Sequence, residues 1–165
     1  KIDMAKSAGH IRASKWENSI YHEGGVRKEY GELSDARKAI VKAELKSVQA
    51  AMWGNLESKS VVLKADDKEI RVGFTKSGTD HAARDAMLTQ SGKYMSRKSM
   101  INIDTILQQS EYVPTSHELY KGRKDGIEYF FKYKDKQGRG IYFKVAYEPA
   151  QGQGKKYYLR SVTDI

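Results

Sequence analysis

The chain of 165 residues has no cysteine, only two prolines and no long apolar run. Without cysteine it can form neither a disulfide nor a thiolate nucleophile or metal ligand. No stretch approaches the roughly 20 apolar residues that a membrane-spanning helix needs, and the first residues lack the hydrophobic region of a signal peptide. The chain begins at Lys1 without an initiator methionine, so we expect a domain cut from a longer protein.

The sequence also lacks the short motifs of several enzyme classes. Its four histidines are scattered and show no His-x-x-x-His or paired-carboxylate spacing for a metal; they are His10, His22, His81 and His117. There is no phosphate-binding loop, no dinucleotide fingerprint and no serine-hydrolase elbow. We therefore expect neither a metal nor a cofactor.

Positive charge is abundant and unevenly placed. Lysine and arginine number 30 against 21 acidic residues, which gives a net charge of +9. Residues 1–70 carry 13 basic and 11 acidic residues, hence +2, whereas residues 71–165 carry 17 and 10, hence +7. A basic half in a chain with eleven tyrosines indicates an anionic partner, with nucleic acid as the first candidate. A basic surface without any specific partner is the alternative.

We interpret residues 1–33 as an extension or linker that partly docks on a domain formed by residues 34–165. Ser34 can cap a helix, and the repeat that follows predicts one buried stripe, ended by a Gly-Asn pair at 54–55. The apolar positions of the stripe are Val41, Leu45, Val48 and Met52.

Alternating residues at 60–63 and 69–74 predict a β-hairpin. A break at Ser77-Gly78 and a capping Asp80 predict a short helix over 81–88. After a loop at 90–99, a further helix is expected over 100–110, with Ile103, Ile106 and Leu107 buried.

The last third alternates at 127–134, 140–147 and 156–163, which predicts a β-meander. Its core face would carry Tyr129, Phe131, Phe143, Val145 and Leu159. The predicted fold class is therefore α+β, with N-terminal helices and a strand hairpin packed on a C-terminal antiparallel β-meander.

The stretch 74–84 concentrates the residues best suited to phosphodiester chemistry. His81 is expected on the first turn of its helix, where the dipole favours a neutral imidazole that can act as a base, although Asp80 opposes this effect. Arg84 would share a helix face with His81, and Lys76 would reach the same phosphate. An exposed or capping histidine without a catalytic role is the alternative.

The second face of the predicted meander mixes rings with cations. Stacking rings between cations is how sheets hold single-stranded RNA, and an ordinary solvated face is the alternative for each residue singly. The candidate RNA-binding residues are Lys132, Lys134, Tyr142, Lys144 and Tyr158. Arg160 and Thr163 on the last strand are candidates for holding the phosphate or donating a proton, with Arg160 on the face of Tyr158 and Thr163 on the opposite one.

In this layout, Gly78-Thr79-Asp80-His81 joins a strand to a helix, and a β-meander follows at the C-terminal end. The layout resembles the phage and mobile-element branch of the Barnase–EndoU–colicin–RelE (BECR) nuclease superfamily. The resemblance covers residues 34–165. It implies a metal-independent ribonuclease, often the C-terminal toxin module of a larger protein, with His81 as the catalytic histidine. Lys76 and a polar residue of the last strand carry over less directly, and the basic residues Lys93, Arg97 and Lys98 depart from the pattern.

We therefore expect an endoribonuclease that acts in the cytoplasm, cleaves RNA (transfer RNA among the candidates) and leaves a 2′,3′-cyclic phosphate. Delivery as part of a secreted or injected protein and an acidic immunity or antitoxin partner would fit this hypothesis. The first alternative is a non-catalytic nucleic-acid-binding module of a larger phage or conjugative-element protein. A less favoured one is an ADP-ribosyltransferase-type toxin, for which the chain offers no cofactor-cradling motif.

Overall fold

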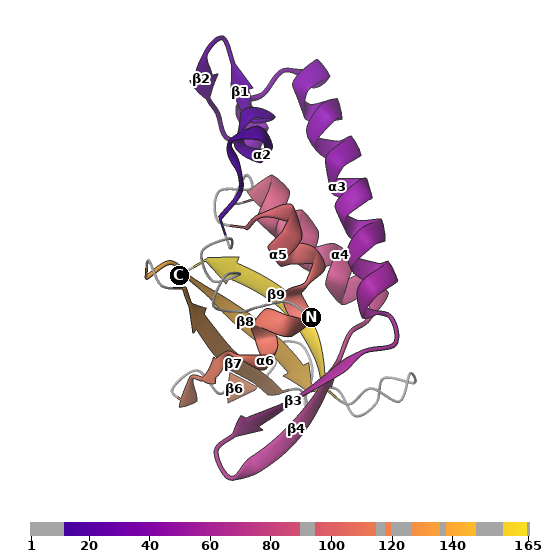
Figure 1. The fold of residues 1–165 in the computed structure, drawn as a ribbon, viewed down its shortest axis with the longest axis vertical. Coiled ribbons are helices and arrows are strands. Elements are labelled where there is room, and N and C mark those ends of the chain that lie inside the picture. The colour runs from indigo at the N-terminus through magenta and orange to yellow at the C-terminus, as the bar shows by residue number, and fades with distance from the viewer. Residues whose placement is uncertain are drawn as a thin grey trace.

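The computed structural model describes residues 12–89, 95–114, 118–119, 127–135, 138–147 and 157–164. The described part of the chain begins with a small helix, a two-stranded hairpin and a 3₁₀ turn at one end of the molecule, beside the start of the longest helix (Figure 1). These elements are α2 (Lys15–Ser19), β1 (His22–Glu23), β2 (Val26–Arg27), η2 (Tyr30–Glu32) and α3 (Asp35–Leu56). Ile20, Tyr21 and Leu33 from this segment belong to the same hydrophobic core as the rest of the described chain.

The long helix α3 forms as its sequence predicts. The Ser34 side chain accepts a hydrogen bond from the backbone N–H of Arg37 at 3.2 Å and so caps the first turn. All four apolar positions of the predicted stripe are buried. The predicted end at 54–55 is wrong: the helix continues to Leu56, whose side chain is fully buried, because packing of this last turn outweighs the low helix propensity of Gly54.

In the residues that the structure describes, seven strands form one mixed sheet in the order β3-β4-β9-β8-β7-β5, with β6 also paired to β7. Their bounds are β3 (Ser60–Ala65), β4 (Lys68–Gly73), β5 (Glu111–Tyr112), β6 (Glu118–Leu119), β7 (Ile127–Lys134), β8 (Gly140–Tyr147) and β9 (Tyr157–Asp164). The α+β class, the hairpin and the meander are confirmed, and the core face of the meander is buried as expected.

The arrangement of the hairpin differs from the prediction. It does not pack on a separate antiparallel meander but joins the same sheet, because β4 pairs in parallel with the start of β9. The sheet curls into a nearly closed, barrel-like form. At the β3 end of this strand order, the Gln108 side chain of α6 (Ile103–Gln108) donates a hydrogen bond at 3.0 Å to the Val62 carbonyl of β3. These contacts satisfy backbone groups that sheet edges would otherwise expose.

One predicted helix is two helices in the structure. The chain forms α5 (Arg97–Ile101) and then α6, because Asn102 between them has non-helical dihedrals of φ −105° and ψ 32°. The three apolar positions predicted for this region, Ile103, Ile106 and Leu107, are buried. The end of the predicted loop at 90–99 is wrong, since Ser96 caps α5 and Arg97 begins it.

The helix that carries His81 starts five residues earlier than predicted. Thr75, not Asp80, is its N-cap, and the Thr75 hydroxyl accepts a hydrogen bond from the Gly78 N–H at 3.0 Å. The helix α4 (Lys76–Arg84) runs directly into a π-helical turn, η3 (Asp85–Thr89). Ser77 and Gly78 are therefore inside the helix and do not break it. In Figure 1, α4 lies between α3 and β9.

Gly78 lets α4 approach the last strand closely. A Cβ atom built on Gly78 would lie within 3.0 Å of the Leu159 carbonyl oxygen of β9 and 2.9 Å from the Thr75 hydroxyl. Real Cβ atoms essentially never approach so closely, and the Leu159 oxygen is backbone that cannot rotate away. The glycine of the Gly-x-x-His sequence therefore has a packing role.

We expect Gly78→Ala to destabilise the protein by about 2–3 kcal/mol, the upper range for overpacking, although alanine is the better helix former by about 1 kcal/mol. The matched control is Gly54→Ala in α3, because Gly54 is exposed and a Cβ there would meet nothing within 4 Å. That control should gain about 0.5–1 kcal/mol. Urea unfolding measures both, and an equal gain in the two variants would contradict the close approach of α4 to β9.

Candidate functional site

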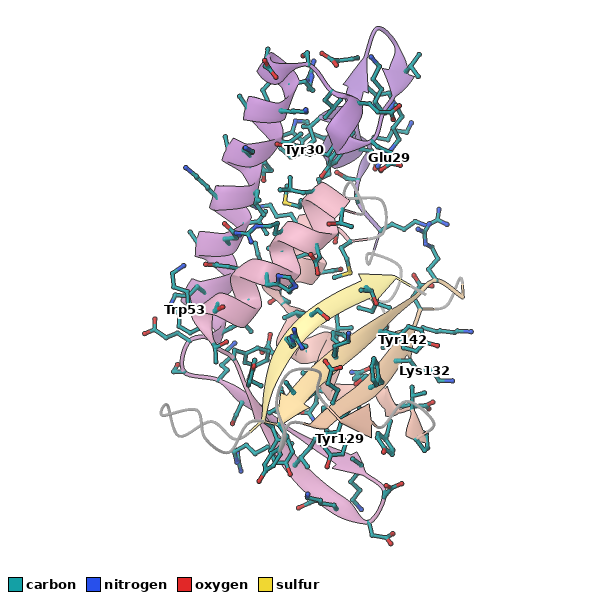
Figure 2. The ribbon with its side chains drawn as sticks, turned by 180° about the vertical axis from the view of Figure 1, so that it is seen from behind. Glu29, Tyr30, Trp53, Tyr129, Lys132 and Tyr142 are labelled. Carbon is teal, nitrogen blue, oxygen red and sulfur yellow. The ribbon has the colours of Figure 1, made fainter. Side chains whose placement is uncertain are left out.

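The candidate site is centred on the outward side of strands β7, β8 and β9, here called the outer face. Cross-strand pairing places Phe130 opposite Lys144 and Lys132 opposite Tyr142. Figure 2 shows Lys132 and Tyr142 beside each other on neighbouring strands. The outer face comprises Glu128, Phe130, Lys132, Lys134, Tyr142, Lys144, Tyr158, Arg160, Ser161 and Thr163.

An irregularity in β9 places more of these residues together than strict alternation allows. Val145 pairs with Leu159, but Lys144 pairs with Ser161, so Arg160 is an extra residue in β9. Such a bulge shifts the alternation by one position. Thr163 pairs with Tyr142 and is exposed, and it therefore lies on the outer face with Arg160. The prediction that Thr163 lies on the face opposite to Tyr158 and Arg160 is wrong for this reason.

The outer face contains a carboxylate that the sequence interpretation missed. The Glu128 side chain is only 9% exposed, and its Oε2 atom lies 3.2 Å from Nη1 of Arg160 and 3.9 Å from Nζ of Lys144. Ala146 pairs with both Glu128 and Tyr158, and its small side chain on β8 leaves Arg160 room to reach from β9 to β7. Alternation along the strand is the sequence signal for this residue, because Glu128 lies two positions before Phe130 and therefore shares its face.

The cations of this face are held against its rings and its carboxylate. Lys144 Nζ lies 5.5 Å from the centre of the Phe130 ring, within the range of a cation–π contact. Removing one member of such a cluster leaves the others with uncompensated charge. The two predicted ligands Lys144 and Arg160 are thus brought together by Glu128, which the prediction did not include.

His81 lies on α4 and pairs with the first residue of the π-helical turn. Its Nε2 atom is 3.2 Å from Oδ2 of Asp85, and its side chain is 49% exposed. The expected first-turn position is wrong, because the helix begins at Lys76 and His81 falls in the last turn. The contact with Asp85 places the hydrogen on Nε2 and leaves Nδ1 for another partner.

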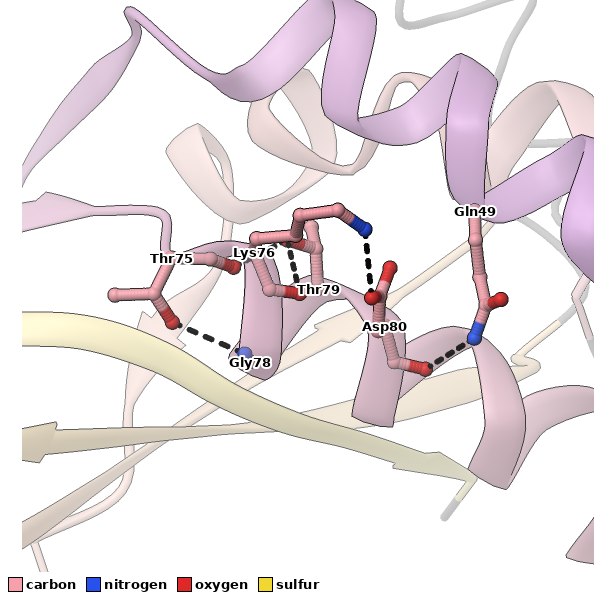
Figure 3. A network of polar contacts seen from close by, with 6 residues as sticks. All are labelled: Gln49, Thr75, Lys76, Gly78, Thr79 and Asp80. Atoms are coloured by element: carbon pink, nitrogen blue, oxygen red, sulfur yellow. Dashed lines mark hydrogen bonds and ion pairs between the residues drawn. The ribbon is translucent and has the colours of Figure 1, made fainter.

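Lys76 is engaged on a different side of the same helix. Its Nζ atom lies 2.9 Å from Oδ2 of Asp80, and Gln49 of α3 donates to the Asp80 carbonyl at 3.0 Å (Figure 3). At 3.6 residues per turn, Lys76 is about 160° around the helix from Gly78, whereas His81 is only about 60° away. His81 therefore borders β9, and Lys76 faces the α3 side.

The packing of α4 against β9 places the helix that carries His81 beside the strand that carries Arg160. Gly78 touches β9 at Leu159, the residue before Arg160. His81 is exposed on the flank of α4 next to this strand, while Thr79 and Ala83 of the same helix are buried. The exposed Arg84 lies one turn beyond His81, as predicted. The histidine of α4 and the charged cluster of the outer face thus lie on adjoining elements.

Other candidate residues lie elsewhere or outside the described ranges. His22 Nδ1 is 3.0 Å from the Asn18 carbonyl in the N-terminal segment, and Arg97 pairs with Glu44 of α3. His10, His117 and Lys93 fall outside the described residues. Within the described ranges, no three His, Cys, Asp or Glu side chains are grouped to hold a metal ion.

On the opposite, core-facing side of the sheet, three tyrosines form a separate cluster toward the β3–β4 hairpin. Tyr129, labelled at that end of the sheet in Figure 2, packs its ring 5.9 Å from that of Tyr157 and 6.3 Å from that of Tyr112. Burial raises the pKa of Tyr129, and hydrogen bonding to Tyr157 raises the pKa of Lys68. These rings pack on one another and extend the core to this end of the sheet.

The described part of the chain contains no helix that is both long and apolar enough to cross a membrane. Comparison with protein-family models, with curated proteins and with solved structures gives no match for this chain.

Proposed function

We propose that this protein is a metal-independent endoribonuclease that cleaves RNA by attack of a 2′-hydroxyl and leaves a 2′,3′-cyclic phosphate. The observation that carries the proposal is the buried Glu128 carboxylate, held by Arg160 and Lys144 on a face lined with aromatic rings and further cations. Next to this face, α4 presents the His81–Asp85 pair. The BECR-like fold suggested by the sequence is part of the same proposal.

The chemistry needs three kinds of group. A base takes the 2′-hydroxyl proton, cations stabilise the charge that develops on the phosphorane, and an acid protonates the leaving 5′-oxygen. Glu128 takes the role of the base, because a carboxylate is a proton acceptor. Arg160 and Lys144 stabilise the phosphorane, and a guanidinium with five donors can bridge a carboxylate and a phosphate.

His81 takes the role of the acid. Asp85 occupies its Nε2, so the proton would be delivered from Nδ1. Thr163 and Arg84 are exposed at the borders of this arrangement and would hold adjacent phosphates. The rings of Tyr142 and Phe130 would stack on the flanking bases, and Lys132 would neutralise the charge of their phosphates.

The test is incubation with RNA in excess EDTA. We expect cleavage, with 2′,3′-cyclic phosphate ends identified by end-group analysis. The matched control is an RNA with 2′-deoxy nucleotides at the cleaved positions, which should stay intact because it lacks the attacking hydroxyl. Cleavage of both substrates would contradict 2′-hydroxyl attack, and no cleavage of any RNA would contradict the proposed activity.

A non-catalytic nucleic-acid-binding module is the second candidate. The pairing of Lys144 with the Phe130 ring and of Lys132 with Tyr142 favours it, since alternating rings and cations bind single strands without any chemistry. In the same experiment this function would give RNA that is bound, in a manner that weakens steeply with salt, but recovered intact.

A further inference from the structure

Tyr21 connects the N-terminal segment to the turn that follows α4. Its side chain is 1% exposed, and its hydroxyl donates a hydrogen bond at 2.8 Å to the carbonyl of Met87 in η3. The guanidinium of Arg27 lies 5.1 Å from the centre of its ring. Burial raises the pKa of Tyr21, so the hydroxyl keeps its hydrogen and remains a donor. This tyrosine is 66 residues away from its acceptor in the sequence.

A second contact attaches the same segment to α5, which packs on α3. Glu17 of α2 accepts a hydrogen bond from the backbone N–H of Arg97 at the start of α5. The Arg97 side chain in turn pairs with Glu44 and donates to Ser47 at 3.0 Å, both on α3. Residues 12–33 thus bridge η3 and α5, and the bridge is anchored to the long helix.

The turn held by Tyr21 begins with the partner of His81. Asp85 is the first residue of η3, so its direction depends on where the α-helical hydrogen bonding of α4 changes to the wider π pattern. A π turn is rare and is retained only where other contacts favour it. Loss of the Tyr21 hydroxyl would leave the Met87 carbonyl buried without its partner, a cost that an altered turn could relieve.

We propose that Tyr21 is a positioning residue, whose hydroxyl holds the π-helical turn Asp85–Thr89 and thereby directs Asp85 toward His81. A residue of the docked extension, far from the site in sequence, would in this way be required for the geometry of the histidine–aspartate pair. The structural part of this proposal does not need the proposed ribonuclease function, and only its catalytic consequence rests on that function.

The test uses Tyr21→Phe in the full chain and the NMR resonances of the His81 ring nitrogens. We expect the Nε2 resonance to move toward its position in Asp85→Asn, in which the pair is broken directly. Tyr133→Phe is the matched control, because it removes another buried tyrosine hydroxyl, from β7, and should leave the resonance in place. An unchanged Nε2 resonance in folded Tyr21→Phe would overturn the proposal.

Two further measurements separate this proposal from the proposed function. If the protein cleaves RNA, Tyr21→Phe should lower kcat about tenfold with little change in KM, since a misdirected catalytic group acts on the chemical step. A moved resonance in a protein without ribonuclease activity would support the role of Tyr21 and contradict the function alone. If Tyr21→Phe folds poorly, the double variant Tyr21→Phe/Gly54→Ala takes its place, because Gly54→Ala stabilises α3. Its His81 Nε2 resonance is then compared with that of the single variant Gly54→Ala.

Discussion

Replacing His81 by alanine is expected to reduce RNA cleavage by about 10²- to 10⁴-fold, the usual contribution of a general acid or base, and to leave the fold intact. The side chain is half-exposed and contacts Asp85 of the next turn, so its removal leaves no cavity in the core. An exposed contact at this i,i+4 spacing contributes at most about 0.3–0.5 kcal/mol. Initial rates on a single RNA substrate, together with circular dichroism and thermal unfolding, measure the two effects.

His22→Ala is the matched control for this experiment. His22 is also partly exposed, and its ring contacts a backbone carbonyl in the N-terminal segment. It should retain full activity. Undiminished cleavage by His81→Ala would remove this histidine from the mechanism, while equal losses in both variants would indicate a general effect on the fold.

Replacing Glu128 by glutamine is expected to reduce cleavage by a similar factor, about 10²- to 10⁴-fold, and at the same time to strengthen RNA binding. Glutamine keeps the shape of the side chain but cannot accept the 2′-hydroxyl proton. It also removes the negative charge of Glu128, which pairs with Arg160 and Lys144, so both cations can bind phosphates more strongly. Since these cations are themselves partly exposed, the stability loss should stay near 1 kcal/mol.

The opposite directions of binding and cleavage make this variant decisive between the two candidate functions. Binding is measured by fluorescence anisotropy at two salt concentrations, and cleavage is measured with the same RNA. Glu69→Gln provides the same change of charge on an exposed position of β4 and should leave cleavage unchanged. If Glu128→Gln cleaves RNA as fast as the unmodified protein, Glu128 is not the base.

The elements were predictable wherever one local pattern decided them. The strands β7 and β8 have the predicted bounds, because alternation over eight residues is a strong signal that the core enforces on one face. The stripe of α3 and the cap at Ser34 follow from the same local rules. The ends of the helices were less predictable. Gly54 predicts the end of α3, but burial of Leu56 extends that helix, and Asp80 predicts the start of α4, but Thr75 caps it.

Half of the candidate site was visible in the sequence. His81, Lys144 and Arg160 were selected from residue type and spacing, and the structure places the last two around one carboxylate. Glu128 has no comparable local signal beyond alternation, because its partners Arg160 and Lys144 lie on other strands and meet it only through the pairing of the sheet. The bulge at Arg160 could not be foreseen, since it depends on the register between β8 and β9.

The sequence by itself determined most of α3, the β3–β4 hairpin, the three long strands of the meander and the basic second half, because each depends on neighbours within a few positions. Only the tertiary structure decided that β4 joins β9, that His81 lies in the last turn of its helix beside that strand, and that Tyr21 supports the following turn. These features depend on contacts between segments that are far apart in the chain. Such contacts are set by packing at Gly78 and by the pairing of buried polar groups, for which local sequence carries no signal.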